Sequence, residues 1–117
     1  NSEEALYLQV RNQIIHGIAT LQLQEGDELP SVRQMADEIG INMHTVNKAY
    51  TVLKQEGFIQ LDRRKGAVIS LDMDKLRELQ SMRVQMKGIL AKGICKGICK
   101  DEVYELVNEI YQEYGGE

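Results

Sequence analysis

The chain has 117 residues, of which 43% are hydrophobic and 27% are charged, and its formal net charge is −4. This size allows one compact domain with a short extension, and the composition is ordinary for a globular protein. No apolar run approaches the roughly 18 residues needed to cross a bilayer, and the first residues do not resemble a secretory signal. We therefore expect a cytoplasmic protein with no membrane partner.

The acidic total does not exclude nucleic acid, because the charge is unevenly distributed. Residues 29–70 carry six basic and four acidic side chains, whereas residues 1–28 and 71–117 hold the acidic excess. Phosphate contact depends on local charge more than on the total. The middle segment is therefore the part able to meet a polyanion.

Two helices are predicted in the first 40 residues. Apolar residues at four-residue spacing favour a helix over about residues 3–19. After Pro30, Ser31 and Gln34 have the spacing of a capping box, and Gly40 is a left-handed stop. Between these signals the apolar residues recur at i, i+3, i+4 and i+7, namely Val32, Met35, Ala36 and Ile39.

A third helix follows after a short turn. Asn42 is a good N-cap, and Gly57 marks the end of the helix. One face is apolar, with Val46, Ala49, Tyr50 and Leu53, and the opposite face is polar. Two short helices joined by about four residues predict a helix-turn-helix.

A hairpin is predicted directly after this helix pair. Residues 58–61 and 67–71 read as strands, and the turn at residues 62–66 carries Arg63, Arg64 and Lys65 in succession. A hairpin in this position is the wing of a winged helix-turn-helix. The fold class is therefore mainly α with a small β-hairpin wing, over residues 1–71.

Residues 72–117 return to a helical period and are predicted to form a two-helix dimerisation segment. The first helix should start near Met73 and stop at Gly93, and the second should begin after Cys99 and end at Gly115-Gly116. Packing of these helices against their own domain alone remains the alternative. We assign dimerisation to the apolar stripe Leu76, Leu79, Met82, Met86, Leu90, Val103, Leu106, Val107 and Ile110.

This order of elements favours double-stranded DNA as the partner. A reading helix meets base edges in the major groove with its N-terminal turn, where backbone N–H groups also favour phosphate. A polar helix face and a basic hairpin tip are each often only solvated, but together with the capped helix pair they are hard to obtain by accident. The predicted DNA-contacting residues are Arg33, Asn42, Met43, His44, Thr45, Asn47, Lys48, Arg63, Arg64, Lys65 and Gly66.

Other functions have less support. A winged helix can dock a protein instead of DNA, and Arg33 can pair with Asp37 rather than with phosphate. We expect no enzyme and no cofactor, because the sequence contains no nucleophile–base pair and no Gly-rich phosphate loop. Cys95 and Cys99 lack the further ligands of a zinc site, so we interpret them as inert thiols. A redox switch, or a metal shared between subunits, stays open.

A set of residues spread over the segment from Leu6 to Ser70 forms a recognisable pattern: Gly17, Gly26-Asp27, Leu29-Pro30-Ser31, Arg33, Ala36, Gly40, Thr45-Val46, Ala49-Tyr50, Leu53, Glu56-Gly57 and Gly66. In these residues the segment resembles the DNA-binding domain of GntR-type regulators. The short helical tail is similar to the YtrA-type subgroup, which lacks a large effector domain.

The resemblance implies a homodimer on an inverted-repeat operator, usually repressing nearby transporter genes. It places Arg33 and residues 42–45 and 47 at DNA-contacting positions, and Gly66 at the wing glycine. Met43 and Asn47 stand where several members carry Arg, so the base preference should differ. Cys99 stands where a Ser would cap the last helix, so we expect a weak cap. The effector is unknown from the sequence.

Overall fold

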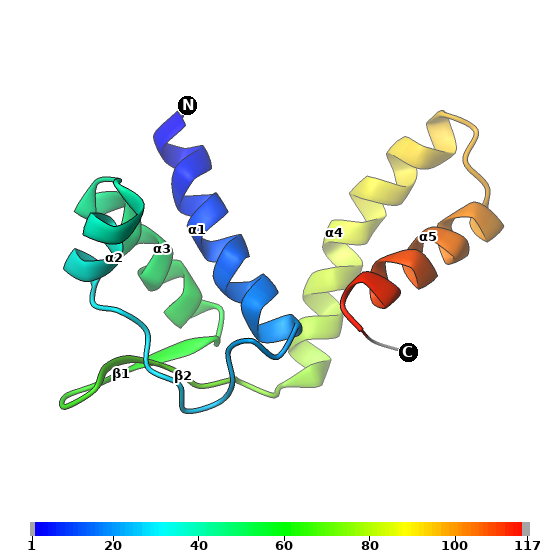
Figure 1. Ribbon diagram of the computed structural model, residues 1–117. Helices are drawn as coiled ribbons and strands as arrows, with labels where there is room; N and C mark the ends of the chain where they lie inside the picture. Colours follow the sequence, from blue (N-terminus) through cyan, green and yellow to red (C-terminus); the bar gives the residue numbers. More distant parts are fainter. Residues whose placement is uncertain (1, 116–117) are drawn as a thin grey trace. The chain divides into compact units, whose positions relative to one another are not determined.

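The computed structural model describes residues 2–115 of the chain, with side chains from Leu6 onward. The chain is mainly helical with one two-stranded antiparallel sheet, which confirms the predicted fold class (Figure 1). It divides after Asp72 into two compact units. The elements are α1 (Ser2–Ala19), α2 (Val32–Ile39), α3 (Met43–Gln55), β1 (Ile59–Asp62), β2 (Gly66–Ile69), α4 (Lys75–Cys95) and α5 (Lys100–Glu113).

The first unit is built around α3. Helices α1 and α2 both pack against α3, and β1 follows it directly (Figure 1). Val46, Ala49 and Leu53 of α3 have no exposed surface, because their spacing places them on one face of the helix. The buried residues that meet this face from the other elements include Val10, Ile14, Leu29, Ala36, Ile59, Ala67 and Ile69.

The caps of α2 are those that the sequence predicts. Ser31 Oγ accepts a hydrogen bond from Gln34 N, and Gln34 Oε1 accepts one from Ser31 N, each at 3.1 Å. Gly40 has φ +70°, a conformation that costs an L-residue free energy, and its N–H donates to Ala36 O. The turn into α3 is thus fixed by local chemistry.

The wing contains more pairing than was predicted. β1 and β2 pair with Ile59 opposite Ile69 and Asp62 opposite Gly66. The segment before α2 also pairs with β2, since Leu29 N donates to Ala67 O at 2.8 Å. Glu28 forms an isolated bridge to Val68 there. This additional pairing connects the wing to the segment that precedes α2.

In the second unit, α4 ends later than predicted. Gly93 lies inside the helix, and the left-handed residue that ends it is Gly97, with φ +78°. Gly97 N donates to Ile94 O, and Ile98 N donates to Gly93 O at 2.9 Å, which is the Schellman arrangement. A Cβ added at Gly93 would lie 3.7 Å from Ile98 Cβ, so Ile98 folds back over Gly93. The prediction of a stop at Gly93 was wrong.

The backbones of helices α4 and α5 stay apart. No Cα atom of α4 lies within 8 Å of one in α5, and none of the residues in either helix is buried. At the start of α5, Glu102 Oε1 accepts a hydrogen bond from Cys99 N, so the glutamate side chain satisfies the backbone N–H of the N-cap residue. None of the helices in the described residues is long and apolar enough to span a membrane.

Candidate nucleic-acid interface

The exposed face of α3 begins at its N-cap. Asn42 Oδ1 accepts a hydrogen bond from His44 N at 2.7 Å, which confirms the predicted cap. Met43, His44 and Asn47 are exposed, and Met43 keeps 45% of its surface. These side chains lie on the first turns of the helix, the part that meets base edges in helix-turn-helix proteins.

Thr45 lies elsewhere, although it was predicted with the contact residues. Its side chain is 2% exposed, because it stands one residue before Val46 on the border of the face that packs into the unit. Its hydroxyl is therefore not part of the exposed face. The sequence prediction was based on position in the N-terminal turn, and that position does not distinguish the buried Thr45 from the exposed His44.

Tyr50 anchors α3 to the segment that starts α2. Its hydroxyl donates to Pro30 O at 2.7 Å. Burial of the phenol, and to a lesser degree the charge of Glu38, raises the pKa of Tyr50 to about 12. Arg33, in the first turn of α2, is exposed and forms no ion pair within the described residues, so the predicted alternative pair with Asp37 is absent.

Asp62 shapes the tip of the wing. Its Oδ1 accepts hydrogen bonds from Arg64 N at 2.7 Å and Lys65 N at 3.0 Å. These two backbone bonds lower the pKa of the Asp62 carboxyl. Gly66 closes the turn with φ +81°.

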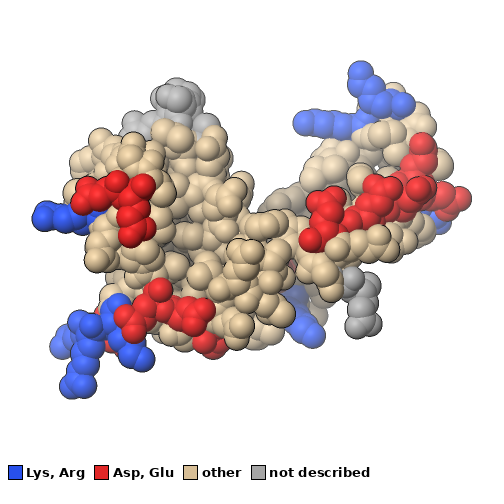
Figure 2. Space-filling view, viewed as in Figure 1, with Lys and Arg blue, Asp and Glu red and all other residues tan. Residues whose placement is uncertain are grey.

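The basic side chains of the tip are exposed beyond this turn. Figure 2 shows Lys and Arg side chains gathered at the end of the hairpin, with acidic side chains on the neighbouring surface. The tip residues are Arg63, Arg64 and Lys65.

One contact of α3 was not foreseen. Lys48 Nζ lies 4.3 Å from the centre of the Tyr7 ring on α1, within cation–π range. Lys48 was predicted as a DNA contact, whereas Tyr7 was not among the predicted site residues. No sequence signal marked the pair, because the two residues meet only once α1 packs on α3.

Amide side chains and cations are among the groups that bind duplex DNA, and both are exposed on this surface. Among the described residues, His, Cys, Asp and Glu side chains form no cluster of three that could hold a metal ion. Cys95 and Cys99 are free and exposed.

Comparison with known proteins identifies the family of this chain. Residues 6–69 match the family described as bacterial regulatory proteins, gntR family. The chain belongs to the GntR family. The matched residues are more than half of the chain and include α2, α3 and the wing.

Relatives with matching tails identify the YtrA-type subgroup within this family. The transcriptional repressor YtrA of Bacillus subtilis is 29% identical over 97% of this chain and 86% of its own length. The solved structure of YtrA from Sulfolobus acidocaldarius, a GntR-family transcription factor, is 38% identical, covers 92% of this chain and 88% of its own, and has a TM-score of 0.54.

A second solved structure supports the fold of the GntR chain. The transcriptional antiterminator from Listeria monocytogenes EGD-e is 31% identical and covers 95% of this chain and 85% of its own, with a TM-score of 0.84. The chain spans 65% of the length of a further B. subtilis relative, the regulator YhcF. These relatives are described as regulators and none as an enzyme, in agreement with the sequence prediction.

Proposed function

We propose that this GntR protein is a sequence-specific DNA-binding repressor that acts in the cytoplasm as a homodimer on an inverted-repeat operator. The observation that carries the proposal is the exposed, Asn42-capped start of α3 beside a hairpin with a basic tip. Residues 1–71 would form the DNA-binding domain, and residues 72–117 the dimerisation segment. Repression is supported by the name of the B. subtilis relative YtrA, and transporter genes as targets by the subgroup resemblance.

Each exposed group has a chemical counterpart on duplex DNA. Asn47 can form two hydrogen bonds with an adenine edge, and Met43 can contact a thymine methyl group. Arg33 suits a backbone phosphate or a guanine edge, and the wing residues suit phosphates along an adjacent groove. Asn42, His44, Lys48 and Gly66 complete the proposed contact set, while Thr45 leaves it because its side chain is buried and its backbone N–H donates to Asn42 O.

The dimer is argued from α4 and α5. Leu76 and Leu79 are 76% and 59% exposed, and the α4 stripe lines a groove of about 600 Å³. Two helices that have no Cα atoms within 8 Å of each other and bury no residue leave much of their apolar faces in water, which is unfavourable by about 25 cal/mol per Å². A second copy that covers these faces would join two reading helices in one molecule, and a palindromic site requires two such helices roughly 34 Å apart.

The DNA contacts are tested by measuring affinity for operator duplexes at several salt concentrations. Arg33→Ala, and neutralisation of Arg63, Arg64 and Lys65 together, should weaken binding about tenfold or more and reduce the salt slope by about 0.9 for each phosphate that is no longer neutralised. Asn47→Ala should mainly relax base preference. The matched control Lys92→Ala, which removes a charge from an exposed position of α4 outside the groove, should bind as wild type. If the three sets all bind like this control, the contact assignment is wrong.

The dimer is tested separately by sedimentation and operator affinity. Leu79→Lys and Met86→Lys should yield monomers with weakened operator binding. Gln85→Lys introduces the same charge on α4 outside the groove and should remain dimeric. Monomeric variants with normal operator affinity would contradict the proposed role of the second unit.

A further inference from the structure

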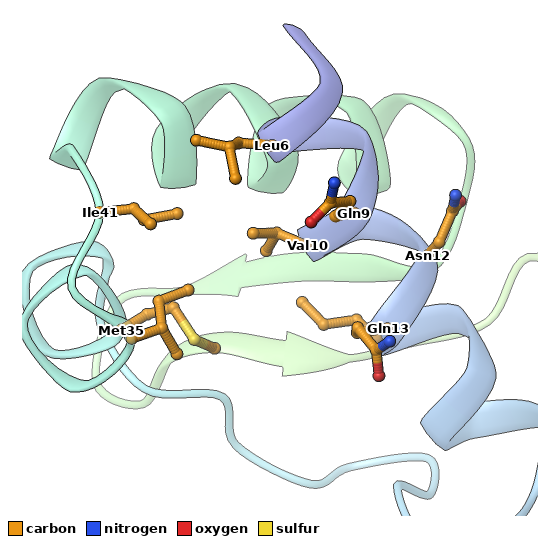
Figure 3. Close-up of a pocket in the computed structure, with 9 residues that line it drawn as sticks. Leu6, Gln9, Val10, Asn12, Gln13, Met35 and Ile41 are labelled. Atoms are coloured by element: carbon orange, nitrogen blue, oxygen red, sulfur yellow. The ribbon is translucent and has the colours of Figure 1, made fainter. Parts of the chain in front are cut away.

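A groove separates α1 from α2 in the first unit. Both helices pack on α3, but within the described residues no Cα atom of α1 lies within 8 Å of one in α2. The groove between them has a volume of about 640 Å³. In Figure 3, Leu6 and Val10 extend from α1 toward the side on which Met35 and Ile41 lie.

The groove is apolar on both sides. Val10 and Ile14 come from α1, and Met35 and Ile39 come from α2. Ile39 keeps 47% of its surface exposed, although it belongs to the apolar stripe of its helix. An apolar residue that lines a groove and remains half exposed has surface available for another apolar group.

The polar groups of the groove are amides from α1. Gln9 and Gln13 line it and form no side-chain hydrogen bond among the described residues, whereas Asn12 Oδ1 already accepts from Arg11. None of the nine lining residues is charged. A charged ligand would lose hydration here without gaining a partner, so the groove suits an uncharged one.

We propose that this groove binds an uncharged, largely apolar small molecule that carries a hydrogen-bonding group. Its volume and its mixture of an apolar floor with a few amides match those of small-molecule sites. The ligand would lie against Met35 and Ile41 and hydrogen-bond with the amide of Gln9 or Gln13.

Occupancy would act on the reading helix, and this part rests on the proposed function. Ile39, Gly40 and Ile41 form the turn that joins α2 to α3, and two of these three residues line the groove. The turn is held by hydrogen bonds from Gly40 N and Ile41 N to Ala36 O. A ligand wedged against this turn moves α2, and with it Arg33, relative to α3, and so lowers operator affinity.

The site is tested on the full chain without DNA by ¹H–¹⁵N NMR titration with N-phenyl-1-naphthylamine, an uncharged apolar amine. The largest shifts should occur at the backbone amides of Met35, Ile39 and Ile41. Shifts confined to α4 and α5 would mean that the probe binds only the second unit and would overturn the proposal. Absence of shifts up to the solubility limit would overturn it as well.

Three variants make the test specific. Gln13→Trp fills the groove from an exposed position and should raise the probe Kd about tenfold. Gln60→Trp adds the same ring on the exposed surface of β1, outside the groove, and should leave the Kd unchanged. Ile39→Gln, which makes the floor polar, should also weaken binding. Equal Kd values for all four proteins would overturn the site.

The regulatory step has its own readout. Saturating probe should lower the operator affinity of the wild type and leave that of Gln13→Trp unchanged. Probe binding in the groove with unaltered operator affinity would overturn the regulation. A protein that binds the probe but no DNA at all would contradict the proposed function and not the site.

Discussion

Lys48 of α3 lies over the ring of Tyr7 of α1, with Nζ 4.3 Å from the ring centre. Lys48 stands at the border of the exposed face, because Thr45 three residues before it is buried and Val52 four residues after it is half-buried. Helix α1 therefore restrains one cation of the proposed reading helix.

This contact predicts energetic coupling between the two residues. In a double-mutant cycle of Tyr7→Leu and Lys48→Ala, the coupling in the free energy of unfolding should be about 0.5–1 kcal/mol. Leucine retains apolar bulk without the ring, so the cycle isolates the cation–π term. Strictly additive effects in urea unfolding would mean that the contact contributes nothing.

Gly57 ends α3 and lies against the last residue of the first unit. Its φ is +84°, and a Cβ added to it would lie 2.6 Å from Asp72 Cβ. Gly57→Ala should lower the free energy of unfolding by about 2–3 kcal/mol, because backbone strain and a clash add.

Gly40→Ala is the matched control for this substitution. Gly40 has φ +70° with nothing within 4 Å of the added Cβ, so only the backbone term of about 1–2 kcal/mol applies. Thermal or urea unfolding of both variants measures the difference. Equal losses would contradict the argued clash with Asp72.

The buried phenol of Tyr50 predicts a stability change at high pH. Its pKa in the folded chain is raised from 10.0 to about 12, so the neutral phenol stabilises the fold below pH 10, and this contribution is lost as the pH rises through 12. Tyr50→Phe lacks the titration and the hydrogen bond to Pro30 O, which costs about 1 kcal/mol near neutral pH.

The measurement is the free energy of unfolding of both proteins as a function of pH. The advantage of the wild type over Tyr50→Phe should shrink between about pH 10 and pH 12. A difference that stays constant over this range would contradict the role assigned to the buried phenol.

Asp62 provides a prediction for the wing. Asp62→Asn keeps an oxygen that can accept from Arg64 N and Lys65 N and removes a negative charge, so operator affinity should be equal or higher. Asp62→Ala removes the same charge and both hydrogen bonds, and the freed tip should bind more weakly than the asparagine variant. Identical affinities for the two variants would show that the turn does not position the tip.

The sequence predicts the helix-turn-helix well, because its signals are local. The capping box of Ser31 and Gln34, the left-handed Gly40 and the Asn42 cap each depend on residues within a few positions of one another. These signals fix where α2 stops and α3 starts, and the apolar periods fix which faces are buried.

Features that depend on distant residues were missed. The end of α4 was also missed although its signals are local, because the repeated Gly-Ile-Cys-Lys segment offers both Gly93 and Gly97 as helix stops, and the choice depends on Ile98 folding back over Gly93. The pairing of Leu29 with β2 needs the whole wing in place. The Tyr7–Lys48 contact and the groove exist only after α1 and α2 have packed on α3.

The claim on which this account depends is that α3 lies in the major groove of duplex DNA and that a second copy presents another such helix. Selection of bound sequences from a random duplex pool tests it directly, since it reports binding, symmetry and spacing together. We predict an inverted repeat whose half-site centres lie about one helical turn, or a multiple of it, apart. Recovery of no enriched sequence at low salt, or of single half-sites without symmetry, would contradict it.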